Sequence, residues 1–442
     1  MKQTPLCDAL RSFASSAPLR MHMPGHKGRP MPLPELNAAA ALDFTELPPT
    51  GNLFEAGGPI QEAEELWAHA FGSKSCLFLT GGSTQGILSA FTLCCRPGDR
   101  VLLDRGCHRS SFNALALLDL HPRYLDRPWL EEPGVTGPVS PEQVDRALTE
   151  WPEIKTVCIT SPTYYGVLSD IPAIARAAHA HGARLIVDGA HGAHLPFLGN
   201  FDLAAADVTV VSAHKTLPAP GQSALLFSSV FSPEELRRAG SIYGSSSPSY
   251  PMMAALDAAR AWMEEEGREN LCAAAAQVGR LRERFPSLTV CHAPLDPARL
   301  VFSCPDGHRA EAGLQTMGVY PEMADSRHVV FICTSADTPE DFVRLEEAWS
   351  AVLKCQPHGV SFPPLPPAPA PVPVLSPRQA RFSPAGTLPL RAAEGRISAC
   401  QVAPYPPGIP VIAPGELITK KNIAYLSQIG YNMEKDTEVV CL

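Results

Sequence analysis

A lysine is the residue of this chain best suited to covalent chemistry. Lys215 follows the apolar run VTVVS (208–212), and between Lys74 and Lys354 the sequence holds only one other lysine, Lys155. Burial at the end of such a run would lower the pKa of the amine and leave it neutral, as Schiff-base chemistry requires. The alternative is a surface lysine that merely follows a strand.

An aspartate ends another apolar run, RLIVD (184–188). Asp188 should be partly buried there, and a buried carboxylate needs a charged or hydrogen-bonding partner. Three partners are open: a metal shared with His191 and His194, a cation of the protein, or the ring nitrogen of a bound heterocycle. The metal is the least favoured, because a third ligand at metal-site spacing is missing, and we assign no metal ligand.

Two further loops carry groups that could bind a planar, phosphorylated ligand. In GGSTQG, which follows the apolar run SCLFLT, the glycines, Ser83 and Thr84 stand where a helix begins and exposes N–H groups to an anion. The same residues could be ordinary helix N-caps, and the motif is neither a Walker A nor a GxGxxG sequence. His108 follows RVLLD, and its ring could lie on a ligand, carry a proton or be polar surface.

These loops belong to a stretch in which short apolar runs alternate with alanine-rich helical segments. That alternation predicts an α/β fold with a mostly parallel sheet covered on both faces. Ligands of such sheets bind beyond the C-terminal ends of the strands, so the lysine, aspartate, histidine and glycine-rich turn should share one edge. Pyridoxal 5′-phosphate needs this set: a lysine for its aldehyde, an acid for its ring nitrogen, donors for its phosphate and a plane against its ring. The expected strands are SCLFLT (75–80), RVLLD (100–104), TVCIT (156–160), RLIVD (184–188), VTVVS (208–212) and ALLFS (224–228).

Composition changes along the chain predict five parts. They are an N-terminal segment (1–42), a large cofactor-binding domain (43–285), a small α+β domain (286–356), a proline-rich linker (357–377) and a small C-terminal domain (378–442). The linker sequence FPPLPPAPAPVPVLSP cannot form helix or sheet interior and should be extended polyproline II.

The overall composition excludes several classes of partner. The chain has 442 residues and a formal net charge of −9, which argues against nucleic acid and against an anionic membrane surface. No apolar stretch approaches the roughly 20 residues that span a bilayer, and the N-terminus lacks the apolar core of a signal peptide. The thirteen cysteines include no CxxC pair, so we expect reduced thiols in a cytoplasmic protein.

The sequence resembles the fold-type I, pyridoxal-phosphate-dependent ornithine/lysine/arginine decarboxylases, in the smaller form without an N-terminal wing domain. This resemblance implies an aspartate-aminotransferase-like large domain, and it covers nearly the whole chain. The HMPGHKG and SxHK elements are its most specific parts. The motifs that carry it are MHMPGHKG (21–28), DFTELPPTGNLFEAGGPIQEAEELWAHAFGS (43–73), FLTGGSTQG (78–86), LLDRGCHRSSFNAL (102–115), SPTYYGVLSDI (161–171), VDGAHGAH (187–194), SAHKTLPAPGQ (212–222), SSSPSYPMMAALDAAR (245–260) and EGRISACQVAPYPPGIPVIAPGE (394–416).

Carried over position by position, the resemblance implies three catalytic residues. Lys215 would hold the cofactor as a Schiff base, Asp188 would pair with its ring nitrogen, and His108 would stack on its ring. Serines of a neighbouring subunit would reach the phosphate, which implies a homodimer. The remaining residues expected at the phosphate or the ring are Gly82, Ser83, Thr84, Ala190, His191, Ser212, His214 and, from the neighbouring subunit, Ser246 and Ser247.

The implied reaction is α-decarboxylation of lysine, ornithine or arginine to CO₂ and a polyamine-type amine, through a Lys215 Schiff base and a quinonoid intermediate. Tyr405 and Glu416 are the expected substrate contacts, with Glu416 as the partner of the cationic side chain. Gly189 stands where relatives commonly have Glu, which leaves the substrate more open than the chemistry. An aminotransferase or a carbon–sulfur lyase of the same fold is the alternative, followed by a binding protein without catalysis.

Overall fold

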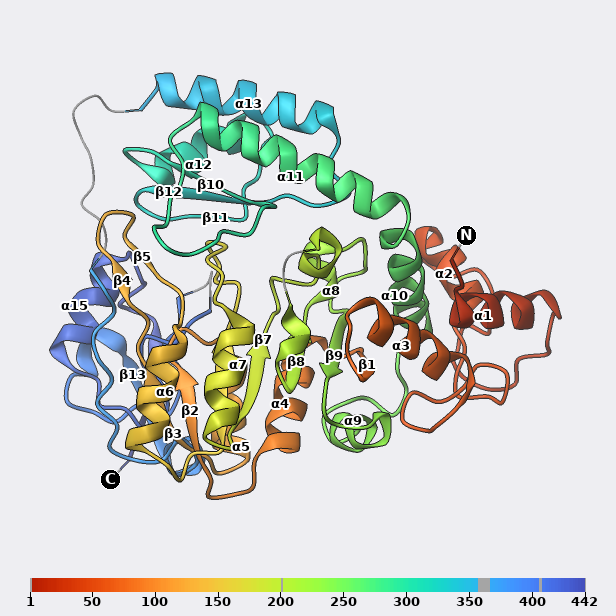
Figure 1. Cartoon of the computed structure of the whole chain (residues 1–442), viewed down its shortest axis with the longest axis horizontal. Coiled ribbons are helices and arrows are strands. Elements are labelled where there is room, and N and C mark those ends of the chain that lie inside the picture. The colour runs from red at the N-terminus through yellow and green to blue at the C-terminus, as the bar shows by residue number, and fades with distance from the viewer. Residues whose placement is uncertain (1, 200–201, 357–365, 405–407, 442) are drawn as a thin grey trace. The chain divides into compact units, whose positions relative to one another are not determined.

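The computed structural model describes residues 2–199, 202–356, 366–404 and 408–441 (Figure 1). The chain divides into two compact units, and each is described by itself. The first unit comprises Met1–Leu93, Ile186–Ala274 and Thr334–Ala336, and the second comprises Cys94–Leu185, Ala275–Cys333 and Asp337–Leu442.

Four strands form the sheet of the first unit, in the order β1-β9-β8-β7. Strand β7 runs parallel to β8, whereas β9 runs antiparallel to both of its neighbours. Every residue of β1, β8 and β9 is buried, which explains why these strands are continuous apolar runs in the sequence. The bounds are β1 Ser75–Leu79, β7 Arg184–Asp188, β8 Val208–Val211 and β9 Ala224–Ser228.

Helices of the first unit cover this sheet with large apolar side chains. Trp67 of helix α3 is fully buried, and Phe71 stacks on Phe227 of β9 with ring centroids 4.1 Å apart. The helices here are α1 Pro5–Ser15, α2 Asn37–Leu42, α3 Gly58–Ala70, α4 Gly82–Cys94, α8 Ala213–Thr216, α9 Pro233–Gly240 and α10 Tyr250–Met263. Helix α11, Glu266–Arg284, follows α10.

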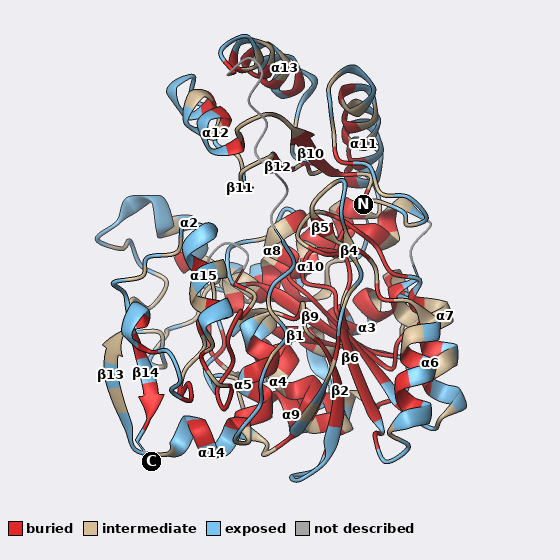
Figure 2. Ribbon diagram, turned by 90° about the vertical axis from the view of Figure 1, so that its left-hand side faces the viewer, coloured by how far each residue is buried: buried red, intermediate tan, exposed pale blue. Residues whose placement is uncertain are grey.

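The second unit contains a parallel set of three strands in the order β6-β2-β3. Figure 2 shows β2 and β6 largely buried, whereas helix α6 has an exposed face. The predicted α/β fold with a mostly parallel sheet is therefore confirmed. The bounds are β2 Arg100–Asp104, β3 His121–Leu125, β6 Thr156–Thr160, α5 Arg109–Leu117, α6 Pro141–Glu150 and α7 Ile171–Ala180, with the short pair β4 Trp129–Leu130 and β5 Val135–Thr136.

Two smaller elements of the second unit follow in sequence. An antiparallel sheet in the order β10-β12-β11 packs with helices α12 and α13, and the pair β13 and β14 lies near helix α15. The bounds are β10 Arg299–Ser303, α12 Gly307–Thr316, β11 Met323–Ala324, β12 His328–Ile332, α13 Pro339–Lys354, α14 Pro377–Phe382, β13 Ala385–Pro389, α15 Lys420–Gln428 and β14 Asp436–Val440.

Part of the expected proline-rich linker can be located. Residues 357–365 lie outside the described residues. Further on, the Val374 N–H donates to the Gly415 carbonyl at 2.8 Å, and the Leu417 N–H donates to the Val372 carbonyl at 2.8 Å. This stretch is therefore tied to the C-terminal part of the chain by backbone hydrogen bonds. The five domain boundaries stay predictions.

Neither a membrane-spanning helix nor a cluster of metal ligands occurs among the described residues. No helix there combines the length and the apolar composition needed to cross a bilayer. No three histidine, cysteine or acidic side chains there gather in a way that would suit a metal ion.

Candidate functional site

The lysine of the site lies in the one-turn helix α8, directly after strand β8. Its Nζ is 3.0 Å from Nε2 of His191, a buried side chain from the loop that follows β7. Strands β7 and β8 are adjacent and parallel, so the loops after their C-terminal ends lie at the same edge. The amine of Lys215 therefore has a base within hydrogen-bonding distance.

The aspartate of the site ends strand β7. Asp188 is 3% exposed and pairs in register with Val210 of β8, and its Oδ1 accepts a hydrogen bond from the Ala190 N–H at 3.2 Å. At Gly189 a Cβ would lie 3.3 Å from the Val210 carbonyl oxygen, to which the Gly189 N–H donates at 2.8 Å. This close approach to β8 leaves little room for a side chain at position 189.

The glycine-rich turn places the start of helix α4 against two strands of the first unit. Gly82 has a φ of +72°, which a residue with a side chain rarely adopts. At Gly86 a Cβ would lie 2.6 Å from Leu79 Cδ1 and 2.6 Å from Val210 Cγ1, so only glycine lets α4 pack so closely on β1 and β8. The half-buried Ser83 and the exposed Thr84 lie in the first turn of this helix.

Two buried hydroxyl groups beside the lysine fit a ligand with hydrogen-bonding groups. Among the described residues, neither Ser212 Oγ nor Thr216 Oγ1 has a hydrogen-bond partner, although both side chains are buried. A buried hydroxyl without a partner is costly, and a phosphate could supply the partner. His214, between them in sequence, has its Nδ1 2.8 Å from the Ser223 carbonyl oxygen. Sequence reasoning missed Thr216, although it directly follows the lysine.

The two serines expected to serve a neighbouring subunit lie on the surface of the first unit. Ser246 and Ser247 are exposed, and the loop that holds them leads to Ser249, the N-cap of helix α10. Their exposure leaves them accessible to a second copy of the chain. Their contact with a phosphate stays a prediction.

The histidine expected on the ring lies in the second unit, at the N-cap of helix α5. Nδ1 of His108 accepts a hydrogen bond from the Ser110 N–H at 3.3 Å and lies 3.0 Å from Ser110 Oγ. The ring is thus oriented through Nδ1. Its role in stacking stays a prediction.

Of the two expected substrate contacts, Tyr405 and Glu416, the structure describes only Glu416. Tyr405 lies outside the described residues. Glu416 is 3% exposed, and its Oε2 accepts hydrogen bonds from Arg105 at 3.0 Å and from the Ala413 N–H at 2.8 Å. Burial raises the pKa of Glu416, and the Arg105 charge opposes that shift. A substrate cation would have to compete with Arg105 for this carboxylate.

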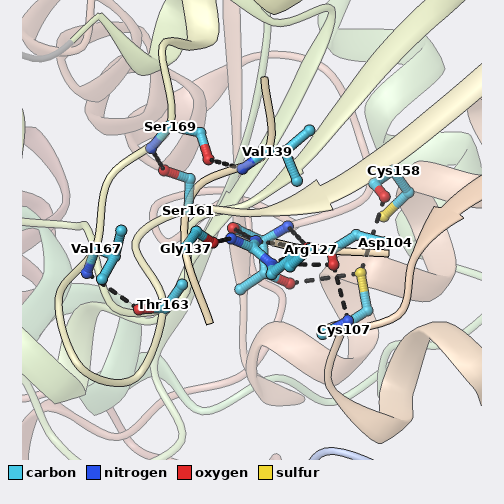
Figure 3. A network of polar contacts seen from close by, with 12 residues as sticks. Asp104, Cys107, Arg127, Gly137, Val139, Cys158, Ser161, Thr163, Val167 and Ser169 are labelled. Carbon is cyan, nitrogen blue, oxygen red and sulfur yellow. Dashed lines mark hydrogen bonds and ion pairs between the residues drawn. The ribbon is translucent and has the colours of Figure 1, made fainter. Parts of the chain in front are cut away.

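A buried ion pair that sequence reasoning missed holds the loop before His108 (Figure 3). Arg127 Nε lies 3.0 Å from both carboxylate oxygens of Asp104, and its NH2 lies 2.6 Å from Oδ2. The same carboxylate accepts hydrogen bonds from the Gly106 N–H at 2.8 Å and the Thr160 N–H at 3.1 Å. Asp104 joins the ends of β2 and β6 in this way. The signal was available, because RVLLD ends in an acid as RLIVD does.

The chain is similar in sequence to known proteins over most of its length. Two family models match: Orn/Lys/Arg decarboxylase, major domain, over residues 4–299, and Orn/Lys/Arg decarboxylase, C-terminal domain, over residues 368–435. The arginine decarboxylase of Bacillus subtilis (strain 168) is 30% identical over 460 residues, which cover 96% of this chain and 93% of that protein.

Solved structures show the same fold at lower identity. The lysine decarboxylase LdcF of Francisella novicida matches with a TM-score of 0.82 at 20% identity, over 99% of this chain and 81% of that chain. A serine palmitoyltransferase from S. paucimobilis, solved with bound PLP, matches with a TM-score of 0.53 at 17% identity, over 66% of this chain and 76% of that chain.

The sheet and the residues at its strand ends define the class: this is an α/β protein with the fold-type I architecture of pyridoxal-phosphate enzymes. Family membership rests on the sequence matches across most of the chain. The chain belongs to the Orn/Lys/Arg decarboxylase family, and it is an amino-acid decarboxylase.

Proposed function

We propose that this protein uses pyridoxal 5′-phosphate to decarboxylate a basic amino acid, with arginine as its substrate. One observation carries the chemistry. The Lys215 amine lies 3.0 Å from His191 and one strand away from the buried Asp188. The Ser212 hydroxyl, three residues before the lysine, has no hydrogen-bond partner among the described residues. A lysine, a buried acid and free hydroxyl donors are what this cofactor requires of a protein.

Each group of the first unit has a role in this proposal. When bound, the cofactor accepts the electron pair released as the carboxylate leaves. Lys215 would hold the cofactor through its amine, while Asp188 would keep the proton on the ring nitrogen. The N-terminus of α4 and the hydroxyl of Ser212 would hold the phosphate, because both present N–H or O–H donors.

The remaining roles extend the proposal beyond the first unit. His108 would lie on the cofactor ring, and Ser246 and Ser247 would reach the phosphate of a second copy in a cytoplasmic homodimer. Light scattering on the purified protein tests the dimer, since a measured mass equal to that of one chain would refute it.

Arginine is the proposed substrate because four relatives that match more than nine-tenths of the chain are named arginine decarboxylases. Besides the Bacillus subtilis protein, arginine decarboxylases of Bacillus anthracis and Bacillus cereus are 29% and 28% identical. The constitutive lysine decarboxylase of Escherichia coli is 23% identical. The amine product would then be agmatine, the decarboxylated form of arginine.

The experiment offers arginine, lysine and ornithine separately to purified protein loaded with pyridoxal phosphate, and follows CO₂ and amine release. The wild type should release CO₂ and agmatine from arginine, whereas Lys215→Ala should release none. Lys155→Ala is the matched control, because Lys155 is an exposed lysine whose Nζ donates to the His181 carbonyl at 2.8 Å. Cadaverine or putrescine instead of agmatine would correct the substrate. Absence of CO₂ from all three would refute the decarboxylase and favour an aminotransferase or a lyase.

A further inference from the structure

The loop that carries His108 begins with a tight turn. The Cys107 N–H donates to the Asp104 carbonyl at 3.0 Å, and the Gly106 N–H donates to the Asp104 carboxylate at 2.8 Å. Asp104 is itself paired with Arg127, so the sheet side of this loop is held. The other side of the loop is held by Arg105, three residues before His108.

The side chain of Arg105 extends from this turn and contacts the C-terminal part of the chain. Its NH2 donates to Glu416 Oε2 and to the Val411 carbonyl, both at 3.0 Å. The guanidinium carbon lies 5.2 Å from the ring centroid of Phe112 and 4.9 Å from that of Tyr124. The two partners are 13% and 4% exposed at their side chains, so this is a buried ion pair between aromatic walls.

The carboxylate partner sits in a rigid turn. Gly415 has a φ of +91°, and a Cβ there would lie 2.3 Å from the Leu375 carbonyl oxygen. The Gly415 N–H donates to the Ser398 carbonyl at 2.8 Å, and Glu416 itself accepts from the Ala413 N–H. Glu416 is therefore presented to Arg105 from a backbone that has little freedom.

A second set of hydrogen bonds holds the backbone of the residue just after His108. The Arg109 N–H donates to the Gly408 carbonyl at 3.2 Å, and the Arg109 carbonyl accepts from Gln401 Nε2 at 3.2 Å. The same amide of Gln401 donates to Asn113 Oδ1 of helix α5 at 2.7 Å. His108 thus lies between two points, Arg105 and Arg109, that the C-terminal part of the chain holds.

A buried ion pair adds little net stability compared with apolar residues of the same size, because desolvation offsets the attraction. An ion pair of defined geometry can instead fix one orientation of the chain segments that carry its two side chains. We propose that Glu416, acting through Arg105, is a positioning residue that fixes the orientation of the His108 ring. This inference rests on the proposed function, in which His108 lies on the cofactor ring, and it gives Glu416 a role other than contact with the substrate.

The test compares Glu416→Gln, Arg105→Met and the double variant with the wild type. Three quantities are measured: the dissociation constant for pyridoxal phosphate, the circular dichroism of the bound cofactor without any amino acid, and kcat and KM. Each single variant should weaken cofactor binding roughly tenfold or more and change the circular dichroism. The kcat should fall by about 100-fold with little change in KM, as expected for a displaced group.

Two further variants identify a pair that acts as one unit. The double variant should be no worse than the poorer single variant, because either change alone already releases the loop. Arg105→Lys should restore part of the cofactor affinity lost in Arg105→Met, since it keeps the charge but not the planar fork.

Two control variants separate positioning from general damage. Glu438→Gln removes a carboxylate from an exposed pair with Arg381, 2.7 Å apart, in the same part of the chain. Val330→Ala opens a cavity in a different apolar cluster of the second unit, around the fully buried Val330, which includes no partner of Arg105 or Arg109. Both controls should keep the cofactor affinity and the circular dichroism of the wild type.

The outcomes separate this inference from the proposed function. An increase in KM for the amino acid with an unchanged cofactor signal in Glu416→Gln would overturn positioning and make Glu416 a substrate contact. Equal cofactor effects in Val330→Ala would overturn it in favour of general stability. If the wild type bound the cofactor but decarboxylated nothing, the binding and dichroism measurements would still decide the inference. A wild type that bound no cofactor would overturn both.

Discussion

The ion pair between Asp104 and Arg127 makes a strong prediction about stability. The two side chains are 0% and 3% exposed, and Arg127 also donates from NH1 to the Gly137 carbonyl at 3.0 Å. In Arg127→Met the carboxylate would stay buried, and its donors among the described residues would be the Gly106 and Thr160 N–H groups. Removal of one partner from such a pair costs about 3–5 kcal/mol of the free energy of unfolding.

The same strand offers a matched control. Arg100, at the other end of β2, pairs with Glu153 at 2.6 Å, but these side chains are 48% and 45% exposed. Because solvent screens such a pair, Arg100→Met should lower the free energy of unfolding by only about 0–1 kcal/mol. The double variant Asp104→Leu/Arg127→Met should recover most of the loss in Arg127→Met, since no uncompensated charge remains.

The assay is urea unfolding at pH 7, followed by circular dichroism for all four proteins. The slope of the transition must stay constant for the free energies to be compared. An Arg127→Met loss of about 1 kcal/mol or less, equal to that of Arg100→Met, would refute the reasoning. A double variant less stable than Arg127→Met would refute it as well, because the damage would then not come from a buried unpaired charge.

Three further predictions concern the glycine-rich turn, the lysine and the small antiparallel sheet. Gly86→Ala should lower the free energy of unfolding by about 1–3 kcal/mol, because the new Cβ would meet Leu79 and Val210 at 2.6 Å. This loss should outweigh the better helix propensity of alanine. A thermal unfolding midpoint at or above that of the wild type would contradict the prediction. In His191→Ala the amine of Lys215 loses the base that lies 3.0 Å away. The cofactor absorbance band should therefore recover more slowly when pyridoxal phosphate is added to the apoprotein. An unchanged rate would argue that His191 only packs there. The pKa of Asp325 lies below its usual value: burial would raise it, but hydrogen bonds from His328 and Tyr165 outweigh that effect. Its stabilising effect is therefore present above the unfolded pKa of about 3.9 and is lost as pH falls through the lower folded pKa. Asp325→Asn should lower the free energy of unfolding at pH 7 but hardly at pH 2, and an equal loss at both values would count against this assignment.

Sequence determined the parts of this protein that depend on neighbours along the chain. Buried strands require runs of apolar residues, and the runs around Phe78, Leu102, Val187 and Val210 all became strands. A helix packed tightly behind a strand requires glycine at its start, and Gly86 shows why. Strand-end chemistry was equally visible, since Asp188 and Lys215 follow neighbouring parallel strands, as their runs indicated.

Tertiary structure alone decided the features that depend on residues far apart in sequence. Strand β3, with the sequence HPRYL, lies at the end of its strand order and alternates between exposed and partly buried residues, so it lacks an apolar run. The antiparallel direction of β9 follows from the path of its connection, which the apolar run around Leu226 does not encode.

The pairing of charged side chains is also a feature that only the tertiary structure decided. A carboxylate at a strand end predicts that a partner exists, but many arginines could reach it. Only the folded chain shows that Arg127 pairs with Asp104 and that Arg105 meets Glu416 from 311 positions away. Apolar burial follows a short period along the chain, whereas an ion pair depends on where two distant backbones meet.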